Sequence, residues 1–213
     1  MKKIKIAIQG ELGAYSHIAA NNLYKDAEIK NCTTFEETFK KAYEDDTYKI
    51  IIPLENSLAG RVADIHYLLP KYKLQIHGEY FLNVEHNLLS KPEATIDDIK
   101  FVRSHAQAIG QCQNIINKKK FKSIISADTA GSAKDLATGD DKSIAAIASA
   151  LSAQIYKLKI LEKNIEDEKG NVTRFLIMGK NIEQPEFKKD KKFITSCIFR
   201  LKSEPSALYK CLG

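Results

Sequence analysis

Residues 171–175 are the part of this sequence best suited to chemistry on a small anion. Thr173 offers a hydroxyl that can donate a hydrogen bond or a proton, and Arg174 offers a guanidinium that can bind a carboxylate through two parallel hydrogen bonds. An acidic run precedes this segment and the apolar run 175–178 follows it. Both side chains are therefore expected together at the mouth of a buried strand.

Four further loops carry small polar residues where a strand is expected to lead into a helix. They hold Tyr15 and Ser16; Glu55, Asn56 and Ser57; Ser104, His105 and Gln107; and Thr129. In α/β proteins, ligands collect beyond the carboxyl ends of strands, where the amides of helix N-termini face solvent. Singly, Ser16, Ser57 and Thr129 could be ordinary helix caps, and His105 could be a helix-entry residue. Together with residues 171–175, these loops favour an anion-binding cleft.

The loops require a framework of alternating strands and helices. Strands are expected at 3–8, 48–52, 99–104, 122–126, 144–148 and 175–179, and helices at 16–24, 57–69, 106–118, 129–137 and 150–156. Thr34, with Glu37 three residues later, predicts another helix that begins with a capping box. A further strand within 74–87 is expected to lead into a different part of the molecule. The alternation favours parallel sheets, covered by helices on both faces, in two lobes.

Composition argues against several classes of protein. The net charge of +6 comes from 33 Lys+Arg against 27 Asp+Glu, and the basic runs lack the interleaved aromatic residues of a nucleic-acid binding face. The four cysteines have no C-x-x-C spacing and the histidines no metal-like spacing, so reduced thiols and no metal site are expected. No segment approaches the ~20 apolar residues of a membrane span, and the N-terminus does not fit a signal peptide. A cytoplasmic protein is expected.

The composition of the sequence changes after Gly179. Residues 181–192 are polar and charged and contain Pro185, which indicates a linker. Residues 193–201 alternate as a strand, and residues 204–209 are expected to begin a helix with Pro205 near its first turn. One strand and one helix cannot bury a core alone. Residues 193–213 are therefore predicted to begin a second domain.

The loop motifs occur in the order found in prephenate dehydratases. The sequence resembles that family over about residues 4–180, through residues 13–16, 53–57, 60–62, 104–105, 107–108, 111–112 and 128–130, and through 171 with 173–175. Ala106 departs from the pattern, because the family usually has Pro there. The tail resembles the first strand and helix of the ferredoxin-like ACT domain that follows in the family. The sequence ends before the ACT segment that carries the family's Glu-Ser-Arg-Pro motif.

The resemblance implies an α/β fold of two lobes, of the type II periplasmic-binding-protein kind. It implies a catalytic domain at 1–180, with its first lobe at about 1–76 plus 174–180 and its second at about 77–173. It further implies a hydro-lyase without cofactor or metal, which converts prephenate to phenylpyruvate, water and carbon dioxide on the route to phenylalanine. A homodimer, and phenylalanine as an allosteric inhibitor, are also implied.

The resemblance also assigns roles to residues. It implies that Thr173 donates the proton and that Arg174 stabilises charge. It implies a substrate-binding set made of Ser16, Asn56, Ser57, Ser104, His105, Gln107, Thr129 and Phe175, supported by Glu55, Tyr15 and Asn171. Two alternatives stay open: arogenate as the substrate, or a cytosolic carboxylate-binding sensor of the same fold, since fold alone does not determine function.

Overall fold

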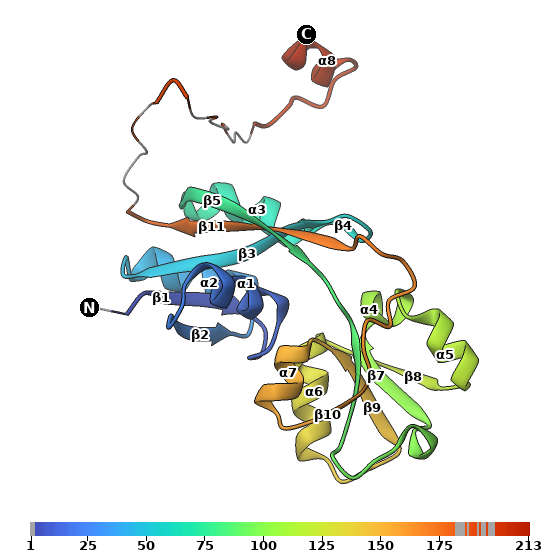
Figure 1. The fold of residues 1–213 in the computed structure, drawn as a ribbon. Coiled ribbons are helices and arrows are strands. Elements are labelled where there is room, and N and C mark those ends of the chain that lie inside the picture. The colour runs from blue at the N-terminus through green and yellow to red at the C-terminus, as the bar shows by residue number, and fades with distance from the viewer. Residues whose placement is uncertain (1–2, 182–185, 187, 191, 193–194, 196–198) are drawn as a thin grey trace. The chain divides into compact units, whose positions relative to one another are not determined.

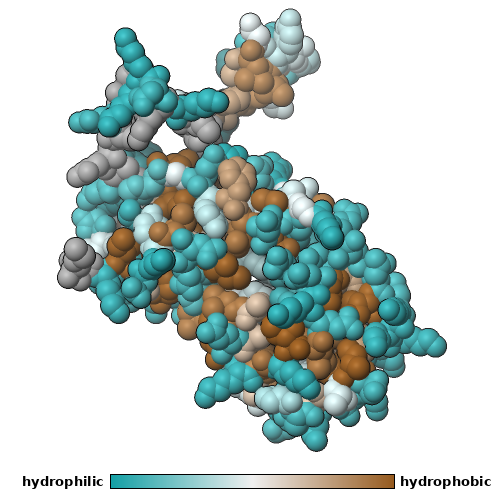
Figure 2. All heavy atoms as spheres, in the orientation of Figure 1, coloured by the Kyte–Doolittle hydropathy of each residue, from teal (hydrophilic) through white to brown (hydrophobic). Residues whose placement is uncertain are grey.

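The computed structural model describes the chain except for residues 1–2, 182–185, 187, 191, 193–194 and 196–198. The chain divides into two compact units, Met1–Ile182 and Glu183–Gly213. The first unit contains two sheets, each at the centre of one lobe (Figure 1). Hydrophilic side chains cover most of the face seen in Figure 2. Within the described part of the chain, no helix is long and apolar enough to cross a membrane.

The first lobe is built on a mixed sheet of six strands. Its order is β2 (Glu28–Cys32), β1 (Lys5–Gln9), β3 (Tyr48–Asn56), β11 (Val172–Gly179) and β5 (Gln75–Asn83), with the short β4 (Gly60–Arg61) paired to β3. β1 is parallel to β2 and β3, whereas β11 is antiparallel to both of its neighbours. The last strand of this unit therefore lies inside the sheet, between two strands that precede it by about a hundred residues.

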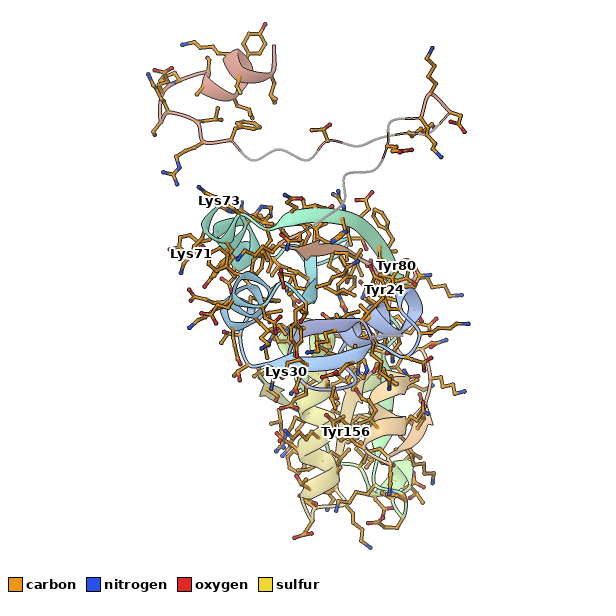
Figure 3. The ribbon with its side chains drawn as sticks, turned by 90° about the vertical axis from the view of Figure 1, so that its left-hand side faces the viewer. Tyr24, Lys30, Lys71, Lys73, Tyr80 and Tyr156 are labelled. Carbon is orange, nitrogen blue, oxygen red and sulfur yellow. The ribbon has the colours of Figure 1, made fainter. Side chains whose placement is uncertain are left out.

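Apolar cores cover both faces of this sheet, because neighbouring strand residues point to opposite sides. On β3, Ile50 and Ile52 pack into one core, together with α2 (Phe35–Glu44) and α3 (Ala63–Tyr72). Ile51 packs into the other, together with α1 (Tyr15–Leu23). Tyr24 and Tyr80, labelled in Figure 3, lie at the edge of this second core. The predicted cap of α2 by Thr34 is confirmed, since its side chain accepts a hydrogen bond from the Glu37 amide, but the Glu37 carboxylate accepts from the Thr33 amide and does not close the predicted capping box.

The second lobe contains a five-stranded mixed sheet. Its order is β10 (Lys159–Glu162), β6 (Asn87–Ser90), β9 (Ile144–Ala148), β7 (Phe101–His105) and β8 (Lys122–Ser126). The helical elements are η1 (Ile96–Asp98), α4 (Ala106–Gly110), α5 (Gln113–Lys119), α6 (Thr129–Thr138) and α7 (Ala150–Ile155). The chain crosses between the lobes at the end of β5 and the beginning of β11, which lie side by side (Figure 1).

The structure corrects several details of the predicted framework. The sheets are mixed and not parallel, and β2, β6 and β10 were not predicted. β3 does not stop at Pro53, and the helix expected at 57–69 begins only at Ala63, after the β4 pairing. The helix expected at 106–118 is broken between α4 and α5. The differences in β3 and at residues 57–62 arise where pairing in the sheet overrides local propensity. The break before α5 occurs where the Asp167 carboxylate accepts from the Gln113 and Asn114 amides.

The lobe boundaries also differ from those expected. β5 and β11 pair along their whole length, as far as the Val172–Asn83 pair, so both belong entirely to the first lobe. The crossings therefore lie at about residues 84 and 171, and not at 77 and 173. The predicted strand at 193–201 lies partly outside the described residues. In the second unit, α8 (Ala207–Leu212) forms two residues after Pro205.

Candidate active site

A cavity of about 470 Å³ lies between the two lobes. This volume is within the range of roughly 300–1,000 Å³ that small-molecule sites occupy. Most of the residues predicted for the site line it: Tyr15, Ser16, Asn56, His105, Gln107, Thr129, Asn171, Thr173 and Phe175. They come from five loops far apart in the sequence, so the cleft expected from those loops is present. Arg174, Glu55, Ser57 and Ser104 are not among the lining residues.

Thr173 is nearly buried, and its hydroxyl is oriented by Asn56. Asn56 Nδ2 donates hydrogen bonds to Thr173 Oγ1 at 2.9 Å and to Asn171 Oδ1 at 2.6 Å. Asn56 Oδ1 accepts from the backbone amides of Leu58 and Ala59, at 3.0 and 2.8 Å. Because backbone amides can only donate, they fix which end of the Asn56 amide faces Thr173. The Thr173 oxygen therefore accepts a hydrogen bond, and its proton is left to be donated into the cavity.

A β-bulge places Asn56 on the cavity face of the sheet. Phe175 pairs with Pro53, but Thr173 pairs with Asn56. Two steps along β11 thus correspond to three steps along β3, and Leu54 is the additional residue. In a regular strand, position 55 would lie opposite Thr173. The bulge therefore turns the amide, and not the preceding carboxylate, toward the threonine hydroxyl.

Arg174 lies on the opposite face of β11 from Thr173, which corrects the expectation that the two side chains lie together at the cleft. Its Nε donates to Glu79 Oε2 at 2.7 Å and its Nη1 to Glu55 Oε1 at 3.0 Å. The hydrogen bonds to Glu55 and Glu79 raise the pKa of Arg174. Adjacent residues of a strand point to opposite sides, so a neighbouring Thr and Arg do not enter one cavity. Glu55, expected to support the site, pairs with Arg174 within the first lobe.

Two of the predicted serines form hydrogen bonds with backbone groups and do not line the cavity. Ser57 Oγ donates to the Gly170 carbonyl at 3.1 Å and accepts from the Val172 amide at 2.9 Å. Ser104 is fully buried within β7 and donates to the Ile147 carbonyl at 2.7 Å. No helix begins at Ser57, because the chain turns there into β4. Both serines therefore support the crossing and the core of the second lobe.

The N-termini of α1 and α6 open onto the cavity from opposite lobes. Ser16 stands in the first turn of α1, and no side chain of the described residues caps that helix at Ala14. Thr129 begins α6, where Asp128 caps the helix by accepting from the Gly131 amide at 2.6 Å. Helix N-termini present amide hydrogens and the positive end of the helix dipole. Two such ends on opposite walls suit a ligand with two negative groups.

Lining residues that were not assigned to the site from the sequence include Arg61, His86 and Gln111, although Arg61 and Gln111 stand in the matched segments 60–62 and 111–112. Arg61 is the only Lys or Arg among the described residues that line the cavity, and its position in the loop after Ser57 could have indicated it. His86 is buried, and burial lowers its pKa. Its ring nitrogens lie 2.8 Å from Tyr15 Oη and 2.9 Å from Gln111 Oε1. A lone histidine gave no signal in the sequence.

The described residues contain no group of three or more His, Cys, Asp or Glu side chains placed to hold a metal ion. The cavity presents neutral hydrogen-bond donors, two helix N-termini, the Arg61 guanidinium and the Asp128 carboxylate that caps α6. His105 also lines the cavity. Its Nδ1 accepts from the Gln107 amide at 3.3 Å and caps α4. Such a site can bind an anion and donate a proton or hydrogen bond to a leaving group.

Comparison with known proteins agrees with this geometry. The family model described as prephenate dehydratase matches residues 6–183. The bifunctional N-acyl-homoserine lactone acylase/prephenate dehydratase of Komagataeibacter europaeus is 38% identical over 98% of this chain and 74% of its own length. Arogenate dehydratase/prephenate dehydratase 1 of Arabidopsis thaliana is also 38% identical, over 99% of this chain. The chain spans about half, 53%, of that plant relative.

A solved structure shares the fold. Prephenate dehydratase from Arthrobacter aurescens, in complex with L-Phe, superposes with a TM-score of 0.79 and 25% identity, covering 87% of this chain and 63% of that one. The match of family model, relatives and solved structure spans both lobes and the cavity between them. The chain belongs to the prephenate dehydratase family.

Proposed function

We propose that this chain catalyses the decarboxylating dehydration of prephenate to phenylpyruvate, a step of phenylalanine biosynthesis. The observation that carries the proposal is the Thr173 hydroxyl, whose oxygen accepts from Asn56 while its proton is free to be donated into the interlobe cavity. Family membership supports the same reaction.

The charge of the site matches that of prephenate, which carries one carboxylate on its ring and one on its pyruvyl side chain. The N-termini of α1 and α6 face the cavity from opposite lobes, so each can bind one of these groups. Arg61 replaces Arg174 as the proposed guanidinium for a carboxylate, because Arg174 is already paired with Glu55 and Glu79.

The reaction needs one proton and no redox change. The C–C bond to the ring carboxylate breaks and releases carbon dioxide, its electron pair enters the ring, and the C–O bond at C4 breaks. The departing hydroxide takes one proton and leaves as water, while the ring becomes aromatic. We infer that Thr173 donates the hydrogen bond to this oxygen as negative charge develops on it, which its hydrogen bond from Asn56 supports. A donor held in advance in this way lowers the barrier without reorganisation.

We propose that prephenate is preferred over arogenate, in which an ammonium replaces the keto oxygen; the charges that line the cavity support this preference. A bound ammonium needs an anionic acceptor, and Asp128 is the only carboxylate among the described lining residues. Asp128 Oδ1 accepts from the Gly131 amide as the cap of α6, so the positive end of that helix offsets part of the carboxylate charge. Arg61 would also repel the ammonium. We therefore propose arogenate as the poorer of the two substrates.

A side-by-side assay tests both parts. The purified chain is incubated with prephenate, and phenylpyruvate is measured by its absorbance in alkali; phenylalanine formed from arogenate is measured in parallel. We expect kcat/KM to be higher with prephenate. A higher value with arogenate would reverse the substrate assignment. Prephenate binding without either product would favour a carboxylate sensor and overturn the enzymatic proposal.

Regulation by phenylalanine and a dimeric state are proposed from the same family membership. The Arthrobacter aurescens relative was solved with L-Phe bound. Repeating the prephenate assay with added L-phenylalanine tests for inhibition, and light scattering with and without L-phenylalanine tests for a dimer.

A further inference from the structure

A line of hydrogen-bonded side chains connects Thr173 with Tyr15, which contacts Glu85 and His86 just after the first crossing between the lobes. Its atoms are Tyr15 Oη, His86 Nδ1 and Nε2, Gln111 Oε1, Asn171 Nδ2 and Oδ1, Asn56 Nδ2 and Thr173 Oγ1, with successive separations of 2.8, 2.9, 2.9, 2.6 and 2.9 Å. All these residues line the cavity, and they come from both lobes.

The direction of this line is set from its Thr173 end. The Leu58 and Ala59 amides force Asn56 to present its NH₂ group to both Thr173 and Asn171. Asn171 then accepts through Oδ1, so its own NH₂ group must be the donor to Gln111 Oε1. Each amide thus fixes the orientation of the next.

The direction of the line determines where the His86 proton lies. Gln111 Oε1 can only accept, so the His86 nitrogen beside it, Nε2, must carry hydrogen. Burial lowers the pKa of His86 and keeps the ring neutral, so Nδ1 has no proton and accepts from the Tyr15 hydroxyl. The Tyr15 hydroxyl has a single hydrogen, and the Glu85 carbonyl, at 2.9 Å, competes with His86 Nδ1 for it. Burial raises the pKa of Tyr15 well above its usual value, so the phenol retains its proton.

The consequence for the cavity concerns Gln111. Its Oε1 is held by His86 on one side and Asn171 on the other. Its NH₂ group is therefore turned away from both and is available to a ligand in the cavity that Gln111 lines. Without the His86 donor, the Gln111 amide can rotate, and the support of Asn171, Asn56 and Thr173 from this end is lost.

We propose that His86 is a positioning residue for the dehydration: with hydrogen on Nε2, it fixes the Gln111 amide and, through Asn171 and Asn56, reinforces the orientation that the Leu58 and Ala59 amides give to the side chains around the Thr173 hydroxyl. His86 acts on the reaction through these neighbours, and its ring faces them through both nitrogens. The inference rests on the proposed function for its kinetic consequence but not for the position of the proton.

Two amide substitutions separate the two nitrogens of the ring. In His86→Gln, the longer side chain can place an NH₂ group near the position of Nε2 and keep the donor to Gln111. In His86→Asn, the shorter side chain reaches only the position of Nδ1 and keeps the contact with Tyr15. His66→Asn, at an exposed position, is the matched control. Circular dichroism and thermal unfolding are recorded for every variant.

We expect His86→Asn to lower kcat by about tenfold with little change in KM, the effect of one lost hydrogen bond. His86→Gln should stay within about threefold of the parent. Equal losses in both folded variants, or a loss confined to KM, would overturn the proposal. Selective ¹⁵N labelling of histidine in the parent chain gives a second readout, since the ring shifts report which nitrogen carries hydrogen.

The labelling experiment stands apart from the kinetics. His86 should show a protonated Nε2 and an unprotonated Nδ1, with its signals assigned by their absence from the His86→Gln spectrum. A protonated Nδ1 with bare Nε2 would overturn the proposal even if activity behaves as expected. If the parent chain does not turn over prephenate, the proposed function fails, and the ring shifts still decide the tautomer. If neither variant folds, the ring shifts of the parent chain still decide the tautomer of His86. The His86 signals are then assigned from a His86→Phe spectrum, or from two-bond correlations between the ring nitrogens and the ring carbon-bound hydrogens.

Discussion

The Thr173 hydroxyl has one close polar neighbour that fixes its direction, Asn56. Thr173→Ala removes the donor and should lower kcat by about 10²-fold, the size found when a positioned donor to a developing oxyanion is lost. Thr173→Ser retains the hydroxyl and should recover most of the rate. Steady-state kinetics with prephenate measure both variants. An unaltered kcat in Thr173→Ala would remove Thr173 from the mechanism.

Buried histidines give the stability of the fold a pH dependence. Burial lowers the pKa of His17 and of His86 from the ordinary value of 6.5. The unfolded chain binds protons below that value more readily than the folded chain, so stability is complete above about pH 6.5 and falls as the pH drops toward the folded-state pKa values. The slope is at most about 1.4 kcal/mol per pH unit for each histidine.

Urea unfolding between about pH 7.5 and 5 measures this loss, because the carboxylates with lowered pKa, such as Glu36 and Asp45, act only at lower pH. His17→Gln removes one of these histidines, which also include His77 with a pKa lowered by burial, and should give a shallower slope. A free energy of unfolding that stays constant across this range would contradict the assignment of these histidines as neutral.

Neighbouring residues of strand β11 point to opposite faces of the sheet, so Thr173 lines the cavity and Arg174 does not. Arg174 pairs with Glu55 and Glu79 on one face, and Arg61 reaches the cavity from β4. Arg61→Gln should therefore raise KM for prephenate by about tenfold while stability changes little. Arg174→Gln should leave KM nearly unchanged and lower the free energy of unfolding by up to about 1 kcal/mol, a size limited by the partial exposure of these side chains.

Kinetics and urea unfolding of the two variants form the test, and each variant is the control for the other. A large rise in KM for Arg174→Gln alone would show that the guanidinium leaves its two carboxylates to bind substrate. That result would restore the role first expected for it from the sequence.

The sequence predicted the loops of the site better than it predicted the orientation of their side chains. The polar loops mark where strands end, and this local signal brought Tyr15, Asn56, Gln107 and Thr173 to one cavity. Orientation depends on pairing between distant strands, which leaves no local pattern. The bulge at Leu54 is visible only in the register of β3 against β11.

The same limit explains the failed predictions. The residue pair 173–174 looks like one functional unit along the chain, but a strand separates its side chains. Ser104 has the same polar character as Ser16, yet it lies within β7 and is buried against Ile147. His86 was missed because its partners, Tyr15 and Gln111, are distant in sequence. Short strands β2, β6 and β10 were missed because their sequences carry little alternation.

At the scale of the whole molecule, the two lobes touch directly at Gly13. The Gly13 carbonyl accepts hydrogen bonds from Ser149 Oγ at 2.6 Å and Ser152 Oγ at 3.1 Å, so a loop of the first lobe is held on α7 of the second. Gly13 has φ of +94°, and a Cβ there would lie 2.8 Å from Ser152 Cα. This contact fixes the width of the cavity on its α1 side.

Gly13→Ala should disrupt the contact between the lobes. A left-handed backbone costs an alanine about 1 kcal/mol, and the steric overlap adds at least about 1 kcal/mol more. Gly170→Ala is the control, because Gly170 also has positive φ but open space around its Cα. Urea unfolding should show a clearly larger loss for Gly13→Ala. Equal losses in the two variants would show that the loop yields without strain.

The insertion of β11 between β3 and β5 has a consequence for how the chain acquires its structure during synthesis. All strands of the second lobe have emerged by Glu162, whereas the first lobe lacks a central strand until residues 172–179 follow. Until then β3 and β5 expose unpaired edges, which are prone to mispairing. The N-terminal lobe is thus the last to be completed on the ribosome, and Thr173 enters the cleft in the same event that closes the sheet.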